Sequence, residues 1–310
     1  METNRFLYAH ELLGDFLRPT LWQTHSDKQV YMTSFLTAVL GLGPAATVAA
    51  HPPDLDTFRG SFGGRHVVPL WRDAAAQTPN VATGLLDTLS EQLQVDVTPE
   101  DLFAYAYALL STPSYVETYS EELTIPGPHL PLTADRELFV EAASIGCQLI
   151  GWHTYGERMG AKAPRGAARN TIPVPTTTDG YPNDFSYDET TCSLHVGEGV
   201  FAPVPPEVFA FEVSGLQVVS SWLNHRKREP SGRNVSSLDR IRPASWTAGM
   251  TVELLELIWT LEATVSHRTA LDDLLQRVIS GPLIATSSLP TANDADQQPV
   301  IEDGSQGTLF

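Results

Sequence analysis

The side chains best suited to chemistry in this sequence are cationic, and they gather in two short stretches. Residues 158–170 read RMGAKAPRGAARN without an acidic residue, and residues 224–234 read NHRKREPSGRN with a single glutamate. Arginine and lysine bind phosphates and guanine edges, and asparagine binds adenine edges. The candidate DNA contacts are therefore Arg226, Lys227, Arg228, Arg233 and Asn234, followed by Arg158, Lys162, Arg165 and Arg169.

The same two stretches have a simpler interpretation. Solvated loops are often basic for solubility alone, and nothing in the spacing of these residues excludes that. Both stretches, however, fall in predicted loops or helix ends, where contacts to nucleic acid are usually mounted. The two interpretations stay open at the level of the sequence.

Side chains for catalysis do not fall into a known pattern. The sequence has no GxxxxGK[ST] phosphate-binding loop and no Asn/Asp-Pro-Pro-aromatic loop of the kind used to methylate base amines. The nine histidines lack metal-ligand spacing, and no spaced lysine accompanies Glu198 and Glu212, as a magnesium-dependent nuclease would require. We therefore expect a non-catalytic protein without a cofactor or a bound metal.

Charge and cysteine content restrict the setting. The 310 residues include 37 acidic and 19 basic ones, which gives a net charge of -18. DNA would be repelled from such a molecule at long range. Binding therefore needs a local basic face, or a partner that supplies the sequence-independent contacts to phosphates. With only two cysteines, no export signal and no membrane-length apolar run, we expect a cytoplasmic protein that does not enter a membrane.

The elements that must position these residues predict an α+β fold, with strand-rich segments interleaved with helical bundles. We expect an N-terminal part over residues 1–160, strand-rich over 4–72 and helical over 81–155. A Pro/Thr/Gly-rich link, 164–182, leads into a C-terminal part over 161–284. That part is strand-rich over 183–213 and helical over 215–280. The polar, acidic residues 285–310 are predicted to form a disordered tail.

Helix boundaries are best marked around residue 99. Thr98 is typical of an N-cap and Pro99 of a first helical residue, and apolar residues recur at helical spacing up to Leu110. Further helices are predicted over 113–123 and 134–155, and Ser266 is predicted to cap the last helix.

The order of residues in this region resembles a known family. Residues 99–123 read PEDLFAYAYALLSTPSYVETYSEEL, and they are followed by a Pro-rich link and a second helix. Further matching pieces are Leu21-Trp22, Pro69-Leu70-Trp71, Leu194-His195-Val196-Gly197, Phe209–Gly215 and Leu238-Asp239-Arg240-Ile241-Arg242-Pro243. Over roughly residues 4–284 the chain resembles the C-terminal target-recognition region of the single-polypeptide type ISP restriction–modification enzymes.

This resemblance implies a role in restriction–modification or phage defence. The chain would be a target-recognition module that reads double-stranded DNA. It would either work with a separate methyltransferase or translocase-nuclease chain or be a fragment cut from such a chain. The motifs for methylation and for ATP-driven movement would lie in that partner, because this sequence lacks them.

A short C-terminal peptide supports an alternative. Gln306, Leu309 and Phe310 resemble the Gln-x-x-Leu-Phe peptide with which bacterial DNA-processing proteins dock onto the replication sliding clamp. Gly307 stands where leucine is commoner, which weakens the match, and a chance match is the simpler interpretation. In this alternative the protein is an adaptor that binds the sliding clamp without reading DNA.

Overall fold

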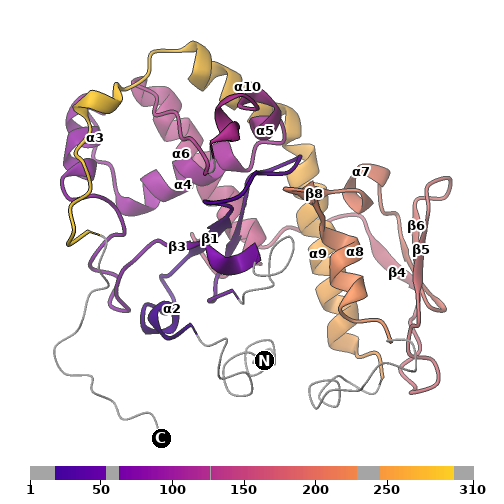
Figure 1. The fold of residues 1–310 in the computed structure, drawn as a ribbon. Helices are drawn as coiled ribbons and strands as arrows, with labels where there is room; N and C mark the ends of the chain where they lie inside the picture. Colours follow the sequence, from indigo (N-terminus) through magenta and orange to yellow (C-terminus); the bar gives the residue numbers. More distant parts are fainter. Residues whose placement is uncertain (1–17, 54–62, 126, 229–244, 297–310) are drawn as a thin grey trace, which may run out of the picture.

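Along the described residues, two larger antiparallel sheets alternate with two groups of helices, and a short two-stranded sheet joins the second part (Figure 1). The computed structural model describes residues 18–53, 63–125, 127–228 and 245–296. The predicted α+β class is confirmed, because helices and antiparallel strands make up separate segments rather than repeating strand–helix–strand units.

The first sheet has the strand order β2-β1-β3 and lies near the centre of the molecule. All its neighbouring strands are antiparallel, and Met32 of the central strand lies opposite Val48 on one side and Val68 on the other. Each residue of the central strand is buried, as expected for a strand covered on both faces. The strands are β1 Tyr31–Ser34, β2 Ala46–Ala49 and β3 Val67–Pro69.

The first helical group packs beside this sheet (Figure 1). Its two longest members, α4 and α6, cross so closely that Gly146 of α6 touches the backbone of Ala104 in α4. A β-carbon at Gly146 would lie 1.9 Å from the Ala104 carbonyl oxygen, so only glycine permits this approach. The helices are α2 Pro19–Gln23, α3 Leu85–Leu93, α4 Pro99–Leu110, α5 Tyr115–Thr118 and α6 Arg136–His153.

Helix α4 begins at the predicted residue. The Thr98 hydroxyl accepts a hydrogen bond from the Asp101 N–H (3.1 Å), and the Asp101 carboxylate accepts one from the Thr98 N–H (3.1 Å). This reciprocal capping satisfies two backbone donors that the first turn would otherwise leave free.

The helix predicted over 113–123 is wrong in length. The structure has the short α5 and a 3-10 turn, Glu122–Thr124, in its place. The Tyr115 hydroxyl donates to the His129 carbonyl (2.6 Å) and accepts from the His129 N–H (2.8 Å). These bonds fix the returning chain at His129 against the start of α5.

The second sheet has the strand order β4-β7-β6-β5. Its first strand was not expected, because it lies inside the predicted link 164–182. The strand forms because it pairs with β7, a partner that the local sequence does not indicate. The register of this pair shifts between Asn170 and Ile172. The strands are β4 Arg169–Ile172, β5 Phe185–Asp188, β6 Ser193–Val196 and β7 Gly199–Ala202.

Helix α9, Ala248–Ser266, lies beside α8, Val218–Asn224, between the first helical group and the second sheet (Figure 1). Helix α10, Arg268–Ser280, follows it directly. The predicted N-cap Ser266 is wrong: this residue is still helical in α9, and its hydroxyl donates to the Ala263 carbonyl (2.7 Å). The smaller elements of this part are α7 Pro206–Phe209, β8 Glu212–Val213 and β9 Leu216–Gln217.

The segment after residue 284 starts as ordered chain. A 3-10 turn covers Thr286–Ser288, and the Asp296 carboxylate accepts a hydrogen bond from the Thr83 hydroxyl (2.6 Å). The Arg72 guanidinium also donates to the Ala295 carbonyl (2.7 Å). Residues 285–296 therefore belong to the described fold, although they were expected to be disordered, and residues 297–310 lie outside the described ranges.

Candidate nucleic-acid interface

Arg158 lies inside the protein. Its side chain is only 6% exposed, and the guanidinium donates to the carbonyls of Gln29 (2.7 Å), Ala50 (2.8 Å) and Glu157 (3.0 Å). A buried arginine that donates to several backbone oxygens ties loops together and has no surface to offer to DNA. We therefore leave Arg158 out of the candidate contacts.

Residues 166–168 are held against one face of α9. The indole N–H of Trp259 donates to the Ala168 carbonyl (2.9 Å), while the Glu262 carboxylate accepts from the N–H groups of Ala167 (2.8 Å) and Ala168 (3.3 Å). Gly166 fits because it has no side chain: a β-carbon there would lie 1.5 Å from a Glu262 carboxylate oxygen. The start of β4 is thus fixed to α9.

This attachment presents two arginines to solvent. Arg165 and Arg169 are exposed, and their guanidinium carbons lie 5.3 Å and 5.8 Å from the centre of the Trp259 ring. Arg169 also donates to the Gly166 carbonyl (2.7 Å). Stacking on an aromatic ring orients a guanidinium without neutralising its charge. Lys162, also exposed, precedes this pair.

The second basic stretch follows α8. Arg226 stacks 3.8 Å above the Trp222 ring centre and pairs with Glu253 of α9 (3.3 Å), so its charge is matched within the protein. Lys227 lies 5.8 Å from the Phe185 ring of β5. Arg228 lies 5.8 Å from the Tyr181 ring and donates to the Thr178 carbonyl. Arg233 and Asn234 lie outside the described residues.

Two of the candidate cations lie at opposite edges of the second sheet. Arg169 begins the edge strand β4, and Lys227 contacts Phe185 of the other edge strand, β5. A four-stranded sheet is about 14 Å wide, since neighbouring strands are about 4.8 Å apart.

The sequence did not indicate the residues that support these cations. Trp259 and Glu262 belong to a helix whose apolar spacing indicates only core packing. Phe185 lies in a predicted strand, and Tyr181 lies in the predicted link. Only tertiary contacts bring them beneath the basic side chains. The clamp-like peptide residues Gln306, Leu309 and Phe310 lie outside the described residues.

The described residues hold neither a metal-binding cluster nor a membrane-spanning helix. No group of three or more histidine, cysteine, aspartate or glutamate side chains there could hold a metal ion. None of the helices in the same ranges is long and apolar enough to cross a membrane.

The sequence of the chain matches one known protein family. The model of the type ISP C-terminal specificity domain matches residues 3–257. The chain belongs to this family. No curated protein sequence matches the chain.

Solved structures share the fold of this specificity domain. The DrdV–DNA complex has a TM-score of 0.57 at 18% identity, over 79% of this chain and 24% of that one. The ATP-dependent type ISP restriction-modification enzyme LlaBIII bound to DNA has a TM-score of 0.54 at 14% identity, over 86% and 16%. A nuclease-deletion mutant of the type ISP enzyme LlaGI, with a DNA substrate mimic, has a TM-score of 0.50 at 13% identity, over 84% and 22%. The specificity domain thus spans less than a quarter of the length of these proteins.

Proposed function

We propose that this chain is a non-catalytic target-recognition module that reads double-stranded DNA in a type ISP-like restriction–modification or phage-defence system. Its membership of a specificity-domain family carries the proposal. The solved relatives are complexes with DNA, or with a DNA mimic, and the cations at both edges of the second sheet give the proposal a surface.

The proposed contacts divide by chemistry. Arg165 and Arg169 are held in place by Trp259, and an oriented guanidinium can form paired hydrogen bonds with a guanine edge or a phosphate. Lys162, Lys227 and Arg228 are suited to phosphates, whose contacts position the protein on the duplex. Arg226 is a positioning residue, because Glu253 already pairs with it. Arg233 and Asn234 remain proposed contacts.

A partner chain would supply what this module lacks. We infer a separate methyltransferase and translocase-nuclease that provides catalysis and the general grip on phosphates, since the module itself carries a net charge of -18. The assembly would work in the cytoplasm, where the free thiols of Cys147 and Cys192 stay reduced.

The test compares two double variants that remove equal charge. R165A/R169A removes the cations stacked on Trp259, and R136A/R268A removes two exposed arginines of α6 and α10. We expect the first pair to weaken binding to random-sequence duplexes at low salt by roughly tenfold or more, because each charge-assisted contact is worth about 1–3 kcal/mol. Fluorescence anisotropy measures the affinity. An equal loss in both variants would mean that net charge alone governs binding, and the proposed surface would be wrong.

A second candidate function depends on residues 306–310. Their Gln-x-x-Leu-Phe pattern supports docking onto the replication sliding clamp, as an adaptor that does not read DNA. Deleting these residues should abolish binding to the clamp in calorimetry while leaving binding to DNA unchanged. Clamp binding that survives the deletion would exclude the peptide as the contact.

A further inference from the structure

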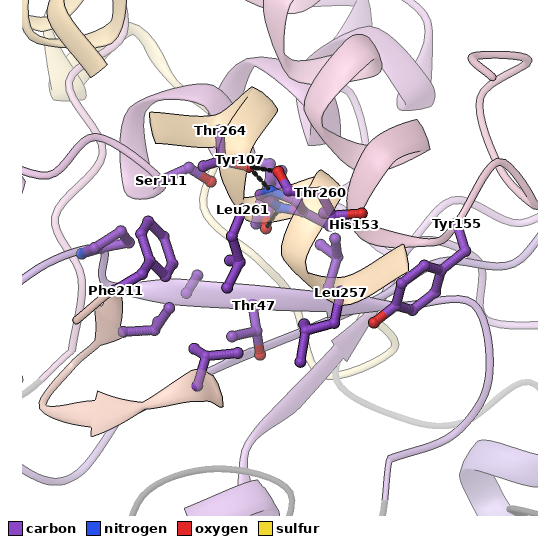
Figure 2. Close-up of a pocket in the computed structure, with 15 residues that line it drawn as sticks. Thr47, Tyr107, Ser111, His153, Tyr155, Phe211, Leu257, Thr260, Leu261 and Thr264 are labelled. Carbon is purple, nitrogen blue, oxygen red and sulfur yellow. Dashed lines mark hydrogen bonds between the residues drawn. The ribbon is translucent and has the colours of Figure 1, made fainter. Parts of the chain in front are cut away.

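A cavity lies between the first sheet, the ends of α4 and α6, and α9 (Figure 2). Its volume is about 160 Å³, and most of its wall is apolar. Side chains from segments far apart in the sequence meet in it, including Val48, Phe211, Leu257 and Leu261. It is separate from the cationic residues, none of which lines it.

One wall of the cavity is a fixed chain of hydrogen bonds. The Tyr107 hydroxyl donates to Nδ1 of His153 (2.5 Å), Nε2–H of His153 donates to the Thr264 hydroxyl (2.8 Å), and that hydroxyl donates to the Thr260 carbonyl (2.8 Å). This order requires a neutral imidazole, and burial lowers the His153 pKa to about 4. Both ring nitrogens are used, so His153 supports the wall and has no free atom for a ligand.

One hydroxyl on this wall, that of Thr260, stands outside the chain of hydrogen bonds. The residue is only 4% exposed, and its oxygen makes no hydrogen bond to any part of the chain that the structure describes. Leaving a buried hydroxyl unpaired costs about 1–3 kcal/mol, so native proteins normally pair such a group with protein, water or ligand. Ser111 adds a second buried hydroxyl to the lining, and it likewise makes no hydrogen bond within the described part of the chain.

We propose that this cavity binds a small uncharged molecule, about the size of a single aromatic ring, that carries a hydroxyl, carbonyl or N–H group for Thr260. An apolar cavity of about 150 Å³ is large enough for a benzene-sized guest. None of the side chains that line it in the described part of the chain is charged near neutral pH, so a bound anion or cation would be left unpaired.

Water is the competing occupant. A buried water needs two to four polar partners, and the largely apolar wall offers a site for at most a few such molecules near Thr260. An organic ring with one polar group satisfies the hydroxyl and also fills the apolar volume. The proposal is independent of the DNA-reading role, because α9 lines the cavity with Leu257, Thr260 and Leu261, whereas Trp259 and Glu262 hold the cationic loop.

The test uses phenol and toluene, which have nearly the same shape but differ in one hydroxyl. We expect phenol to bind the full chain with millimolar affinity and toluene to bind at least about fivefold more weakly, since one hydrogen bond separates them. Chemical-shift changes in NMR spectra, followed against ligand concentration, measure both affinities. Failure of both probes to bind, or equal affinity for the two, would overturn the proposal.

Two variants locate the site. Thr260→Val keeps the shape and removes the hydroxyl, so it should abolish or reverse the preference for phenol over toluene, because the phenol hydroxyl is then buried without a partner. Ala46→Leu fills the cavity and should abolish binding of both probes, and its thermal midpoint reports whether the fold survives. Unchanged phenol binding in folded Ala46→Leu would place the probe elsewhere and contradict the assignment. If that variant does not fold, the comparison of phenol with toluene on the unaltered chain still decides the matter.

Discussion

His153 shows how strongly one buried side chain can govern stability. Burial holds its pKa at about 4, below the ordinary value of 6.5, so the folded protein keeps the imidazole neutral while the unfolded chain binds a proton below pH 6.5. The free energy of unfolding should therefore fall as the pH is lowered from 6.5 toward 4. The neutral form is what the hydrogen bonds to Tyr107 and Thr264 require.

We predict that His153→Gln reduces this pH dependence. Between pH 6.5 and 4.5 the wild-type free energy of unfolding should drop by roughly 2 kcal/mol more than that of the variant, since one pKa unit corresponds to about 1.4 kcal/mol. Urea unfolding at several pH values measures the difference. Parallel pH profiles for the two proteins would show that His153 is not responsible.

Single residues were the hardest features to predict from the sequence. The basic stretches could be listed, but Arg158 turned out to be buried and Arg226 to be paired with an acid. Arg165 stays exposed because Trp259, more than ninety positions later, lies beneath it. Such partners are set by tertiary packing, which local spacing does not encode.

At the scale of elements, the contact between α4 and α6 depends on one glycine. Gly146→Ala would place a methyl group 1.9 Å from the Ala104 carbonyl oxygen, and the two helices would have to move apart. We expect the free energy of unfolding to fall by about 1–3 kcal/mol, as overpacking typically costs.

Gly249→Ala is the matched control. This glycine lies in the first turns of α9, and the nearest atom to an added β-carbon, the Thr247 hydroxyl oxygen, is 3.6 Å away. Alanine there should stabilise the protein by about 0.5–1 kcal/mol, because it restricts the unfolded chain. Urea unfolding of both variants measures the two opposite shifts. A stable Gly146→Ala protein would mean that the helix pair adapts easily.

Elements with strong local signals were predicted well. Helix α4 begins at Pro99 because its capping residues are all local. Helix α5 is shorter than expected, and the chain after it returns so that His129 bonds to Tyr115. Strand β4 was missed because its partner β7 lies about thirty residues away. Where long-range hydrogen bonds decide the backbone path, short windows of sequence give no warning.

For the whole molecule, charge limits how DNA binding can depend on salt. Apart from the buried Arg158 and the paired Arg226, the described candidate contacts are Lys162, Arg165, Arg169, Lys227 and Arg228. We therefore predict that the logarithm of the association constant falls with the logarithm of salt concentration with a slope between about -2 and -5. Anisotropy titrations from 20 to 200 mM salt, roughly the range over which such slopes are resolved, measure it. A slope steeper than about -8 would require a much larger basic surface than the proposed one.

Helix α9 has a further consequence for how variants of this protein are interpreted. This helix lines the cavity with Leu257 and Leu261, and it also fixes residues 166–168, next to Arg165 and Arg169, through Trp259 and Glu262. A substitution in the N-terminal half that tilts α9 would change the distance between Arg169 and Lys227, although neither residue is substituted. Weaker DNA binding by such a variant would then result from a displaced α9. Only variants whose thermal midpoint is unchanged can therefore identify residues that contact DNA.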